Sequence, residues 1–326
     1  MSKIRTAVVG LSLGMRHAYA YHHHAALCEL CYVVDLNEEL ARTTAEQFGC
    51  NYATDWRHIV DQVDAISFAT PHHLHYPMAM EAIAAGKHVL MEKPLANTEE
   101  ESLKMIQAAE DQGVKLMVAF VRRFDPAFQR LQQAIQQEEY GKLINVNCWV
   151  EAYLTPKPGS WFSRVDTLGG GVLFSHGCHT IDILISMLGM PVEVAGLGTR
   201  SGTDWMEGEG TYQAVMKFAG GALGHLCISW GMPFKDTPAK MHLHATGGCF
   251  VLKGDKLEVI TAEGRKTLYA PSGPAIPNSF AFNEVEHFLT CIRDDRQPLV
   301  DGREGLKSSR VAWALYAHQG TPIAAL

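Results

Sequence analysis

The first 120 residues alternate between short apolar stretches and segments of helix length. Apolar stretches that predict strands cover residues 4–10, 30–35, 65–70, 88–92 and 116–120. Helix patterns cover the segment after the first strand and residues 38–48, 76–85 and 99–112. Strands that alternate with helices form parallel pairs with right-handed crossovers. The sequence therefore predicts an α/β fold that begins with a doubly wound parallel sheet, covered by helices on both faces.

From about residue 121 the pattern changes to longer alternating stretches with glycine-rich turns between them. The expected strands are residues 144–153, 193–198, 211–218, 222–230 and 240–246, and the expected helices are residues 128–139, 172–188, 280–294 and 304–318. Alternation of this kind is typical of antiparallel sheets with one buried face. We expect two domains, residues 1–121 and residues 122–326, the second built on a large open, mostly antiparallel sheet packed by helices. Because an open apolar sheet face needs a cover, we expect a homodimer or homotetramer formed through this sheet.

Composition argues against several classes of protein. The chain has 326 residues, of which 47% are hydrophobic and 19% charged, as in soluble globular proteins. A formal net charge of -7 without a basic run argues against nucleic acid as the main partner. We expect no membrane span, because no apolar stretch was found to reach the length of about 18 residues that crosses a bilayer. The eight cysteines, scattered through apolar stretches, fit a reducing compartment, so we expect a cytoplasmic protein.

Polar residues follow two of the predicted parallel strands at the point where each strand ends. Thr70, Pro71 and His72 follow residues 65–69, and Glu92, Lys93 and Pro94 end the strand at residues 88–92. In a doubly wound sheet the ligand crevice lies outside the carboxyl ends of the strands. Lys93 is therefore placed for chemistry, although a bare Glu-Lys-Pro sequence is equally compatible with a solvated lysine on a surface turn.

The first predicted strand is followed by a glycine-rich turn. Gly10, Ser12, Leu13 and Gly14 lie where backbone N–H groups and a helix dipole bind a pyrophosphate, but Ser12 stands at the place of an expected second glycine and Gly14 comes one residue early. Asp35 ends the second strand, where a carboxylate accepts hydrogen bonds from ribose hydroxyls and repels a 2′-phosphate. This favours NAD over NADP. A plain glycine turn and a surface aspartate remain the simpler alternatives.

Several linked motifs resemble one family. They are residues 70–75 (TPHHLH), 85–89 (AGKHV), 92–94 (EKP), 122–124 (RRF), 169–171 (GGG) and 179–182 (HTID). In this order and spacing, the chain resembles the glucose-fructose oxidoreductase and inositol dehydrogenase family (Gfo/Idh/MocA) over nearly its whole length. The resemblance implies a Rossmann domain, a second α/β domain with an open sheet, an NAD or NADP cofactor, and a sugar or cyclitol substrate.

The resemblance also implies roles for individual residues. Lys93 is expected beside the nicotinamide, hydrogen-bonded to the reacting hydroxyl, with Glu92 helping to fix it. His179 is expected to be the general base or proton relay. Further cofactor contacts are implied for Thr70, Pro71, His75, Glu92 and Arg122, and substrate contacts for Trp161, His176 and Arg123.

The chain departs from the family pattern at Ser175. Many dehydrogenases of the family carry an aspartate there, four residues before the histidine, and a serine cannot hold its negative charge. Either the relay is rebuilt around Ser175, with His176 as a candidate, or a different position of the substrate is oxidised. Phe162 also stands where relatives often have arginine. We expect no metal site, because the spacing of His176, His179 and Asp182 spreads over too much of a helix for one ion.

The sequence thus favours an NAD-dependent dehydrogenase that acts on a secondary hydroxyl of a sugar, sugar derivative or cyclitol. Two alternatives stay open. One is a redox-assisted glycosidase or lyase, in which a tightly held NAD oxidises a glycoside transiently and the hydride is returned after elimination. The other is a non-enzymatic NAD-binding regulator, against which the presence of Lys93 and His179 argues.

Overall fold

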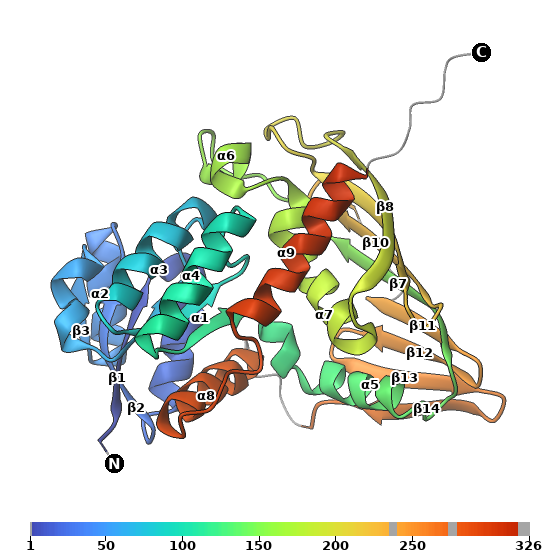
Figure 1. The fold of residues 1–326 in the computed structure, drawn as a ribbon, viewed down its shortest axis with the longest axis horizontal. Coiled ribbons are helices and arrows are strands. Elements are labelled where there is room, and N and C mark those ends of the chain that lie inside the picture. Colours follow the sequence, from blue (N-terminus) through green and yellow to red (C-terminus); the bar gives the residue numbers. More distant parts are fainter. Residues whose placement is uncertain (1, 235–239, 273–278, 319–326) are drawn as a thin grey trace. The chain divides into compact units, whose positions relative to one another are not determined.

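The computed structural model describes residues 2–234, 240–272 and 279–318 (Figure 1). By packing, the chain divides into two compact units. The first contains Met1–Phe124 and Ile276–Leu306, and the second contains Asp125–Ala275 and Lys307–Leu326. The first boundary lies three residues from the expected one. The return of residues 276–306 to the first unit is not part of the expected division.

The first unit is built on a six-stranded parallel sheet with the order β3-β2-β1-β4-β5-β6. Its strands are β1 (Ile4–Val9), β2 (Cys28–Val34), β3 (Asn51–Ala53), β4 (Ala65–Phe68), β5 (His88–Glu92) and β6 (Leu116–Ala119). This is the strand order of the Rossmann fold. The chain adds β2 and β3 on one side of β1 and then β4, β5 and β6 on its other side, so the order of addition reverses between β1 and β4. The predicted parallel sheet is confirmed, and only β3, which is three residues long, lacked a prediction.

Helices of the first unit follow their predicted ranges closely. They are α1 (Leu11–His23), α2 (Glu38–Phe48), α3 (His75–Ala84), α4 (Glu99–Gln112) and α8 (Ser279–Arg293), with short 3₁₀ turns η1 (Trp56–Gln62), η2 (His72–Leu74) and η3 (Val121–Phe124). Side chains cap the starts of α2 and α4: Asn37 accepts a hydrogen bond from the Leu40 N–H at 3.2 Å, and Thr98 does the same for Glu101. Gly49 and Gly113 end these two helices in the left-handed conformation.

Helix α8 belongs to the first unit, which corrects the expectation that residues 280–294 pack on the antiparallel sheet. It lies against α1 and η3. At the contact the His23 ring stacks on Phe282 with centroids 4.6 Å apart, and His24 Nε2 lies 3.0 Å from the Phe282 carbonyl oxygen. The period of apolar residues predicted that α8 has a buried face. It could not predict that this face packs on α1, because α1 lies about 260 residues away in the chain.

The second unit is built on an eight-stranded sheet with the order β14-β13-β12-β11-β7-β10-β9-β8. Its strands are β7 (Leu143–Glu151), β8 (Pro191–Thr199), β9 (Thr211–Phe218), β10 (Leu223–Ser229), β11 (Met241–Ala245), β12 (Gly248–Lys253), β13 (Lys256–Thr261) and β14 (Gly264–Tyr269). Among the described strands, β10 and β7 pair in parallel and the other neighbours are antiparallel. The predicted mostly antiparallel sheet is confirmed and extends through β12–β14.

One face of this sheet carries the core of the second unit. Along β9, Tyr212, Ala214, Met216 and Phe218 are buried, while Gln213, Val215 and Lys217 are exposed. Figure 1 shows α5 (Pro126–Gln136), α7 (Cys178–Leu188) and α9 (Gly302–Ala317) along one side of the sheet. The first residues of α9, up to Leu306, belong to the first unit. The second unit also contains the short helix α6 (Val165–Leu168), the 3₁₀ turn η4 (Trp161–Ser163) and the π-helical turn η5 (Leu173–Gly177).

Residues 165–188 correct one expectation from composition. This stretch is long and apolar enough to span a membrane by length and composition, contrary to the expectation that no segment would be. However, 72% of its most apolar window is buried inside the protein. Its apolar side chains, such as Leu173, Phe174 and Leu184, belong to the core of the second unit. The segment therefore has the burial of a core helix.

Candidate active site

The glycine turn after β1 brings two parts of the first unit into close contact. Gly10 has φ +86°, and a Cβ atom there would lie 2.5 Å from the Ala69 carbonyl oxygen. At Gly14 a Cβ atom would lie 2.8 Å from Val8 Cγ1. Gly14 therefore allows the close helix–strand packing for which the family fingerprint uses a later glycine. Ser12 and Leu13 are exposed in the first turn of α1, where backbone N–H groups lack helical partners and suit a pyrophosphate.

Asp35 follows β2 and contacts this turn. Its Oδ2 accepts a hydrogen bond from the Leu11 N–H at 2.8 Å, and its Oδ1 accepts one from the Asn37 N–H at 2.9 Å. Each carboxylate oxygen can accept a further hydrogen bond, as a ribose hydroxyl would require. The residues of this turn therefore fit an adenine dinucleotide.

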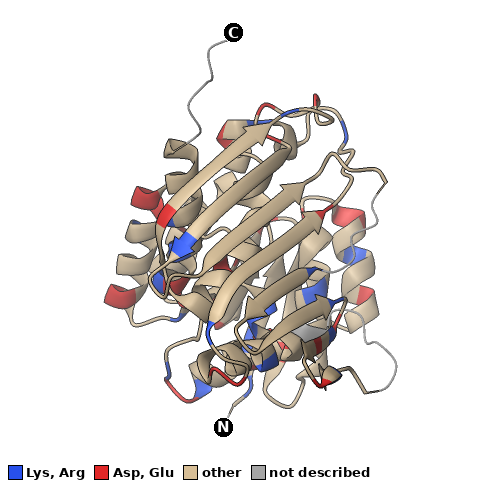
Figure 2. Cartoon of the chain, turned by 90° about the vertical axis from the view of Figure 1, so that its right-hand side faces the viewer, with Lys and Arg blue, Asp and Glu red and all other residues tan. Residues whose placement is uncertain are grey.

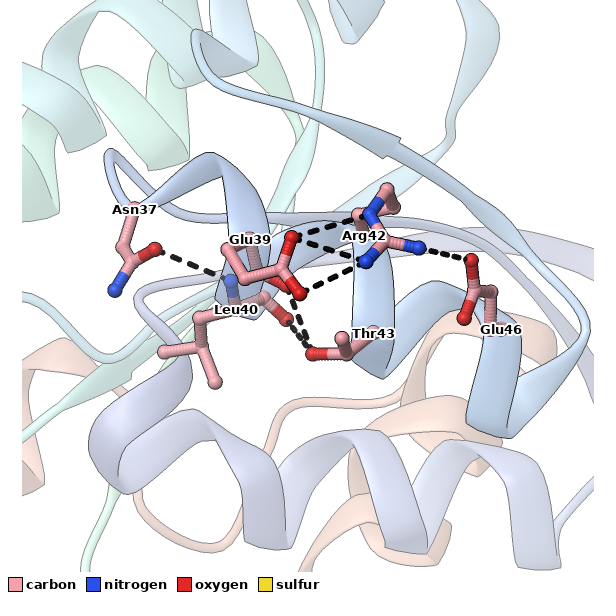
Figure 3. Close-up of polar contacts among 6 residues, drawn as sticks. All are labelled: Asn37, Glu39, Leu40, Arg42, Thr43 and Glu46. Atoms are coloured by element: carbon pink, nitrogen blue, oxygen red, sulfur yellow. Dashed lines mark hydrogen bonds and ion pairs between the residues drawn. The ribbon is translucent and has the colours of Figure 1, made fainter.

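The first basic residue after Asp35 is engaged by carboxylates. Arg42 on α2 forms ion pairs with Glu39 and Glu46 on the same helix (Figure 3). These exposed pairs contribute little to stability. They do mean that the guanidinium has two acidic neighbours, which disfavours a 2′-phosphate at this end of the site and favours NAD.

His75 connects the segments that follow β4 and β5. Its ring is fully buried, with Nδ1 2.8 Å from the Pro94 carbonyl oxygen and Nε2 2.9 Å from the Thr70 carbonyl oxygen. Burial lowers the pKa of His75, although the two carbonyl contacts oppose this shift. The structure thus brings Thr70, Pro71, His75 and Pro94 together at the carboxyl ends of neighbouring strands, as expected for a ligand crevice.

Lys93 lies directly after β5 and is partly exposed. The side chain of Glu92 is buried, and its Oε2 accepts a hydrogen bond from the backbone N–H of Lys93 at 3.2 Å. Arg122 and Arg123 lie in η3, after the last strand of the sheet. Arg122 is half-buried, whereas Arg123 is buried with its guanidinium 3.8 Å from a carboxylate oxygen of Glu304.

In the second unit, His176 lies among aromatic rings. Trp230 Nε1–H donates a hydrogen bond to His176 Nδ1 at 3.1 Å. Because an indole nitrogen only donates, the neutral His176 ring carries its proton on Nε2. Phe162 connects Trp161, at a centroid distance of 4.1 Å, to Trp230 at 5.7 Å, and Trp205 stacks on Trp230 at 6.3 Å. We call Trp161, Phe162, Trp205 and Trp230 the aromatic wall.

Ser175 and His179 flank His176 on one continuous helical segment. The predicted helix 172–188 begins with η5, so that Ser175 and His176 lie in a π-helical turn and His179 lies in the first turn of α7. The His176 and His179 rings are 6.2 Å apart. Ser175 is buried. Wide π-turns often occur at functional sites, because they displace side chains from the regular helical positions.

A polar network holds the glycine triplet that precedes η5. Tyr316 Oη donates to Glu209 Oε1 at 2.8 Å and accepts from the N–H groups of Gly171 and Phe174 at 3.1 and 3.3 Å. Glu209 Oε1 also accepts from the Leu173 N–H at 3.1 Å. A Cβ atom at Gly170 or Gly171 would collide with Tyr316 or Glu209, so these glycines permit a close approach of the backbone to the two side chains. Burial raises the pKa of Glu209.

The predicted site residues therefore form two groups, each described within its own unit. The first unit holds Gly10, Ser12, Leu13, Gly14, Asp35, Thr70, Pro71, His75, Glu92, Lys93, Arg122 and Arg123, and the second holds Trp161, Ser175, His176 and His179. Sequence reasoning missed Trp205, Trp230, Glu209 and Tyr316. Glu209, Tyr316 and Trp230 contact the helical segment that carries Ser175 and His176, and Trp205 stacks on Trp230. No local period or motif connects these residues to that segment.

Comparisons with known proteins identify the family. Residues 4–120 match the model of an oxidoreductase family with an NAD-binding Rossmann fold, and residues 128–251 match the C-terminal domain of the same family, Gfo/Idh/MocA. The chain belongs to the Gfo/Idh/MocA family. The resemblance inferred from the motifs is thereby confirmed, as are the oxidoreductase class and NAD as the cofactor of the Rossmann domain.

Three of the similar proteins are named as dehydrogenases. A UDP-N-acetylglucosamine 3-dehydrogenase from Acidithiobacillus ferrooxidans is 32% identical over 94% of both chains. A levoglucosan dehydrogenase from Pseudarthrobacter phenanthrenivorans is 30% identical over 75% of this chain and 72% of that protein. The scyllo-inositol 2-dehydrogenase (NAD(+)) of Bacillus subtilis is 26% identical over 91% of this chain and 89% of that protein.

Solved structures of the family share the fold. A levoglucosan dehydrogenase in complex with NADH and levoglucosan has a TM-score of 0.87 at 23% identity, with 97% of each chain covered. An NAD-binding oxidoreductase from Klebsiella pneumoniae has a TM-score of 0.86 at 27% identity, again with 97% of each chain covered. The Gfo/Idh/MocA architecture thus extends over nearly the whole of this chain.

Proposed function

We propose that this protein is an NAD-dependent dehydrogenase that oxidises a secondary hydroxyl of a sugar, sugar derivative or cyclitol. The observation that carries the proposal is the surroundings of His176, where an aromatic wall adjoins hydrogen-bonding histidines. Binding sites for small molecules combine a largely apolar lining with a few placed polar groups. The relatives named for levoglucosan, scyllo-inositol and UDP-N-acetylglucosamine support a polyhydroxylated ring as the substrate.

Lys93 and His179 are the proposed proton-transfer residues. Bound NAD supplies the hydride acceptor. When a hydride leaves a carbinol carbon, the hydroxyl proton must leave as well, and an amine or an imidazole can receive it. We assign the hydrogen bond to the reacting hydroxyl to Lys93 and the general-base or relay role to His179. Ser175 contributes a hydroxyl without a charge, so the negative charge of the family aspartate is not reproduced there.

Binding roles follow the two groups of residues. For the cofactor we propose Gly10, Ser12, Leu13, Gly14, Asp35, Thr70, Pro71, His75, Glu92, Lys93 and Arg122. For the substrate we propose Trp161, His176 and Arg123. Of these, Arg123 has the weakest support, because its guanidinium already lies near Glu304 in the first unit.

A hydride-transfer screen tests the proposal. The purified chain is incubated with NAD or NADP and with free sugars, cyclitols, sugar acids and glycosides, while cofactor absorbance and products are measured together. We expect reduction of NAD with one class of polyol, and loss of this activity in Lys93→Met. Release of an aglycone without net reduction would instead establish the redox-assisted glycosidase, which the Ser175 departure also accommodates. If no substrate is turned over and the Lys93→Met variant keeps its biological function, the chain is a non-enzymatic NAD-binding regulator.

We also propose that the chain forms a cytoplasmic homodimer or homotetramer through the outer face of the eight-stranded sheet. We define this outer face by Leu197, Val215, Leu223, Trp149 and His242, which share one side of the sheet by strand register. Leu197 is 63% exposed, and Val215 and Leu223 are nearly half exposed. Figure 2 shows that the strands on this side carry few charged residues. A second copy of the same sheet would bury these side chains.

A further inference from the structure

Three titratable side chains are buried together in the first unit, behind the proposed catalytic lysine. His17 on α1 and Glu284 on α8 are completely buried, and Glu92 at the end of β5 is 5% exposed. His17 Nε2 lies 3.7 Å from Glu92 Oε1 and 4.0 Å from Glu284 Oε2. Three elements that are far apart in the chain therefore place an imidazole between two carboxyl groups. Buried ionisable groups are rare, and those that occur are usually paired or functional.

The cluster cannot carry a charge on every member. Two carboxylates that share one buried imidazole repel each other, and burial disfavours the charged form of each group. Burial lowers the pKa of His17 to about 4, with Glu92 opposing the shift. Burial also raises the pKa of Glu284 well above its usual value, and Glu92 adds to that increase. Burial therefore favours the neutral form of both His17 and Glu284.

Within the described residues, neither ring nitrogen of His17 and neither carboxyl oxygen of Glu284 has a hydrogen-bond partner. Both distances to His17 Nε2 also exceed hydrogen-bond length. Buried polar atoms of this kind are costly and call for an explanation beyond packing. The three groups therefore lie within about 4 Å of His17 Nε2 without forming a saturated hydrogen-bond network.

Glu92 connects the cluster to Lys93. One oxygen of its carboxyl group, Oε1, faces His17, and the other, Oε2, accepts the hydrogen bond from the Lys93 N–H. A shift of the Glu92 carboxyl group therefore moves a group that touches the backbone of Lys93. Since small displacements of a reacting group reduce rates steeply, the residues behind Glu92 can influence the lysine without touching the substrate.

We propose that His17 and Glu284 are positioning residues for Lys93: packed together behind Glu92, they hold its carboxyl group against the Lys93 N–H. This proposal rests on the catalytic role of Lys93 in the proposed function. Because burial favours the protonated form of Glu284, the proposal predicts that loss of the Glu284 proton places a negative charge beside the Glu92 carboxyl group and weakens the arrangement.

Other charged groups around Glu284 also influence the pH at which it loses its proton. The titratable and charged residues on the elements around it are Arg16, His17, Tyr19, Tyr21, His22 and His23 on α1, His88 and Glu92 on β5, Arg122 and Arg123 on η3, and Glu286, His287, Cys291 and Arg293 on α8 itself. Arg16 lowers the pKa of Glu284, but less than burial and Glu92 raise it. Glu286 is exposed on the same helix and provides a matched control.

Infrared spectroscopy of the full chain tests the protonation state directly. Near neutral pH, we expect the carbonyl-stretch band of a protonated carboxylic acid in the wild-type protein and in Glu286→Gln, and its loss in Glu284→Gln. A wild-type spectrum without such a band would overturn the proposal, because Glu284 would then be ionised. This measurement requires neither a substrate nor a cofactor.

Two variants separate positioning from folding. Glu284→Gln mimics the protonated acid, whereas Glu284→Leu removes the polar group and keeps an apolar side chain in the core. After ¹³C-methylation of lysines, the Lys93 resonance is assigned by its loss in Lys93→Arg. We expect this resonance to keep its chemical shift in Glu284→Gln and Glu286→Gln and to move in Glu284→Leu. An unchanged resonance in a folded Glu284→Leu variant would overturn the positioning role.

Once a substrate has been found, steady-state kinetics test whether the Glu284 variants change catalysis. We expect Glu284→Leu to lower kcat about tenfold with little change in NAD affinity, which corresponds to a loss in the transition state alone. The ratio of kcat in Glu284→Gln to kcat in the wild type should rise with pH, because glutamine cannot lose the proton. A ratio that is independent of pH would contradict the proposal. If no substrate reacts, the proposed function fails while the infrared and lysine measurements still decide this inference.

Discussion

At the scale of single residues, Asp35 is the residue that we propose to discriminate between NAD and NADP. Its carboxylate already accepts two backbone hydrogen bonds, so its orientation is fixed within the protein. We expect Asp35→Asn to weaken NAD binding and to remove the repulsion of a 2′-phosphate. The ratio of the NADP to the NAD dissociation constant should fall about tenfold, equivalent to about 1.4 kcal/mol. Fluorescence titration with both reduced cofactors measures this ratio.

Asp61→Asn is the control for this change, because Asp61 is exposed and belongs to η1, away from the glycine turn. It should leave both dissociation constants unchanged. An Asp35→Asn variant with the wild-type preference for NAD would show that the discrimination comes from other residues.

His17 gives the fold a defined acid sensitivity. Its pKa falls from 6.5 in a model peptide to about 4 in the folded protein, so the unfolded chain binds more protons in the interval between these values. The contribution of His17 to stability therefore rises with pH in this interval and is lost as the pH falls, whereas the raised pKa of Glu284 acts in the opposite direction. Between about pH 7.5 and pH 5, roughly 2 kcal/mol of the unfolding free energy should disappear through this one residue.

Urea denaturation at these two pH values measures the effect. A folded His17→Gln variant has no imidazole to protonate and should lose less stability over the same interval. Equal losses in both proteins would mean that other groups, such as exposed carboxylates, account for the acid sensitivity.

At the scale of elements, the segment from the glycine triplet to α7 depends on side chains from elsewhere in the second unit. Tyr316 of α9 provides one hydroxyl to two backbone N–H groups and to Glu209. We expect Tyr316→Phe to leave Glu209 and these amides with fewer partners and to destabilise the protein by about 1–3 kcal/mol. Denaturant unfolding measures this loss. Tyr153→Phe, at a position 56% exposed, should change stability by only a few tenths of a kcal/mol.

In the same segment, the sequence predicted the helix but not the geometry of its first turn. The apolar period predicted a helix over 172–188. The π-helical turn at Ser175 and His176 has no signature in this period. The residues of this turn contact Glu209, Tyr316 and Trp230, which are distant in the chain, so local patterns could not predict these contacts.

At the scale of the whole molecule, the outer face of the eight-stranded sheet gives a test of assembly. Val215 lies on this face, opposite Ala195 and His225 in the neighbouring strands. A charge there would be buried without a partner in an interface between two copies, which costs several kcal/mol. We expect Val215→Glu to shift the protein toward the monomer, as measured by size-exclusion chromatography with light scattering.

Leu103→Glu is the matched control, because Leu103 is 41% exposed on α4 and lies outside this sheet. It should leave the molar mass unchanged. A wild-type protein that is already monomeric at micromolar concentration would contradict assembly through the sheet.

Most of the architecture was predictable at this scale. Alternation of strands and helices specified the parallel sheet, and longer alternating stretches specified the antiparallel sheet. Strands β12–β14 and the packing of α8 were not predicted. The motifs at Gly10, Asp35, Glu92 and Lys93 were readable because they follow strands directly. The aromatic wall and the pair formed by His17 and Glu284 were not, since their members become neighbours only through the fold.

The return of residues 276–306 to the first unit limits how this protein can be engineered. A cofactor-binding module cut at Phe124 would lack α8, and with it Glu284 and the cover over α1. Exchange of cofactor modules between relatives therefore requires three junctions, one after η3 and one on each side of α8, rather than a single N-terminal cassette. The path of the chain thus prevents the first unit from being exchanged as one continuous piece of sequence.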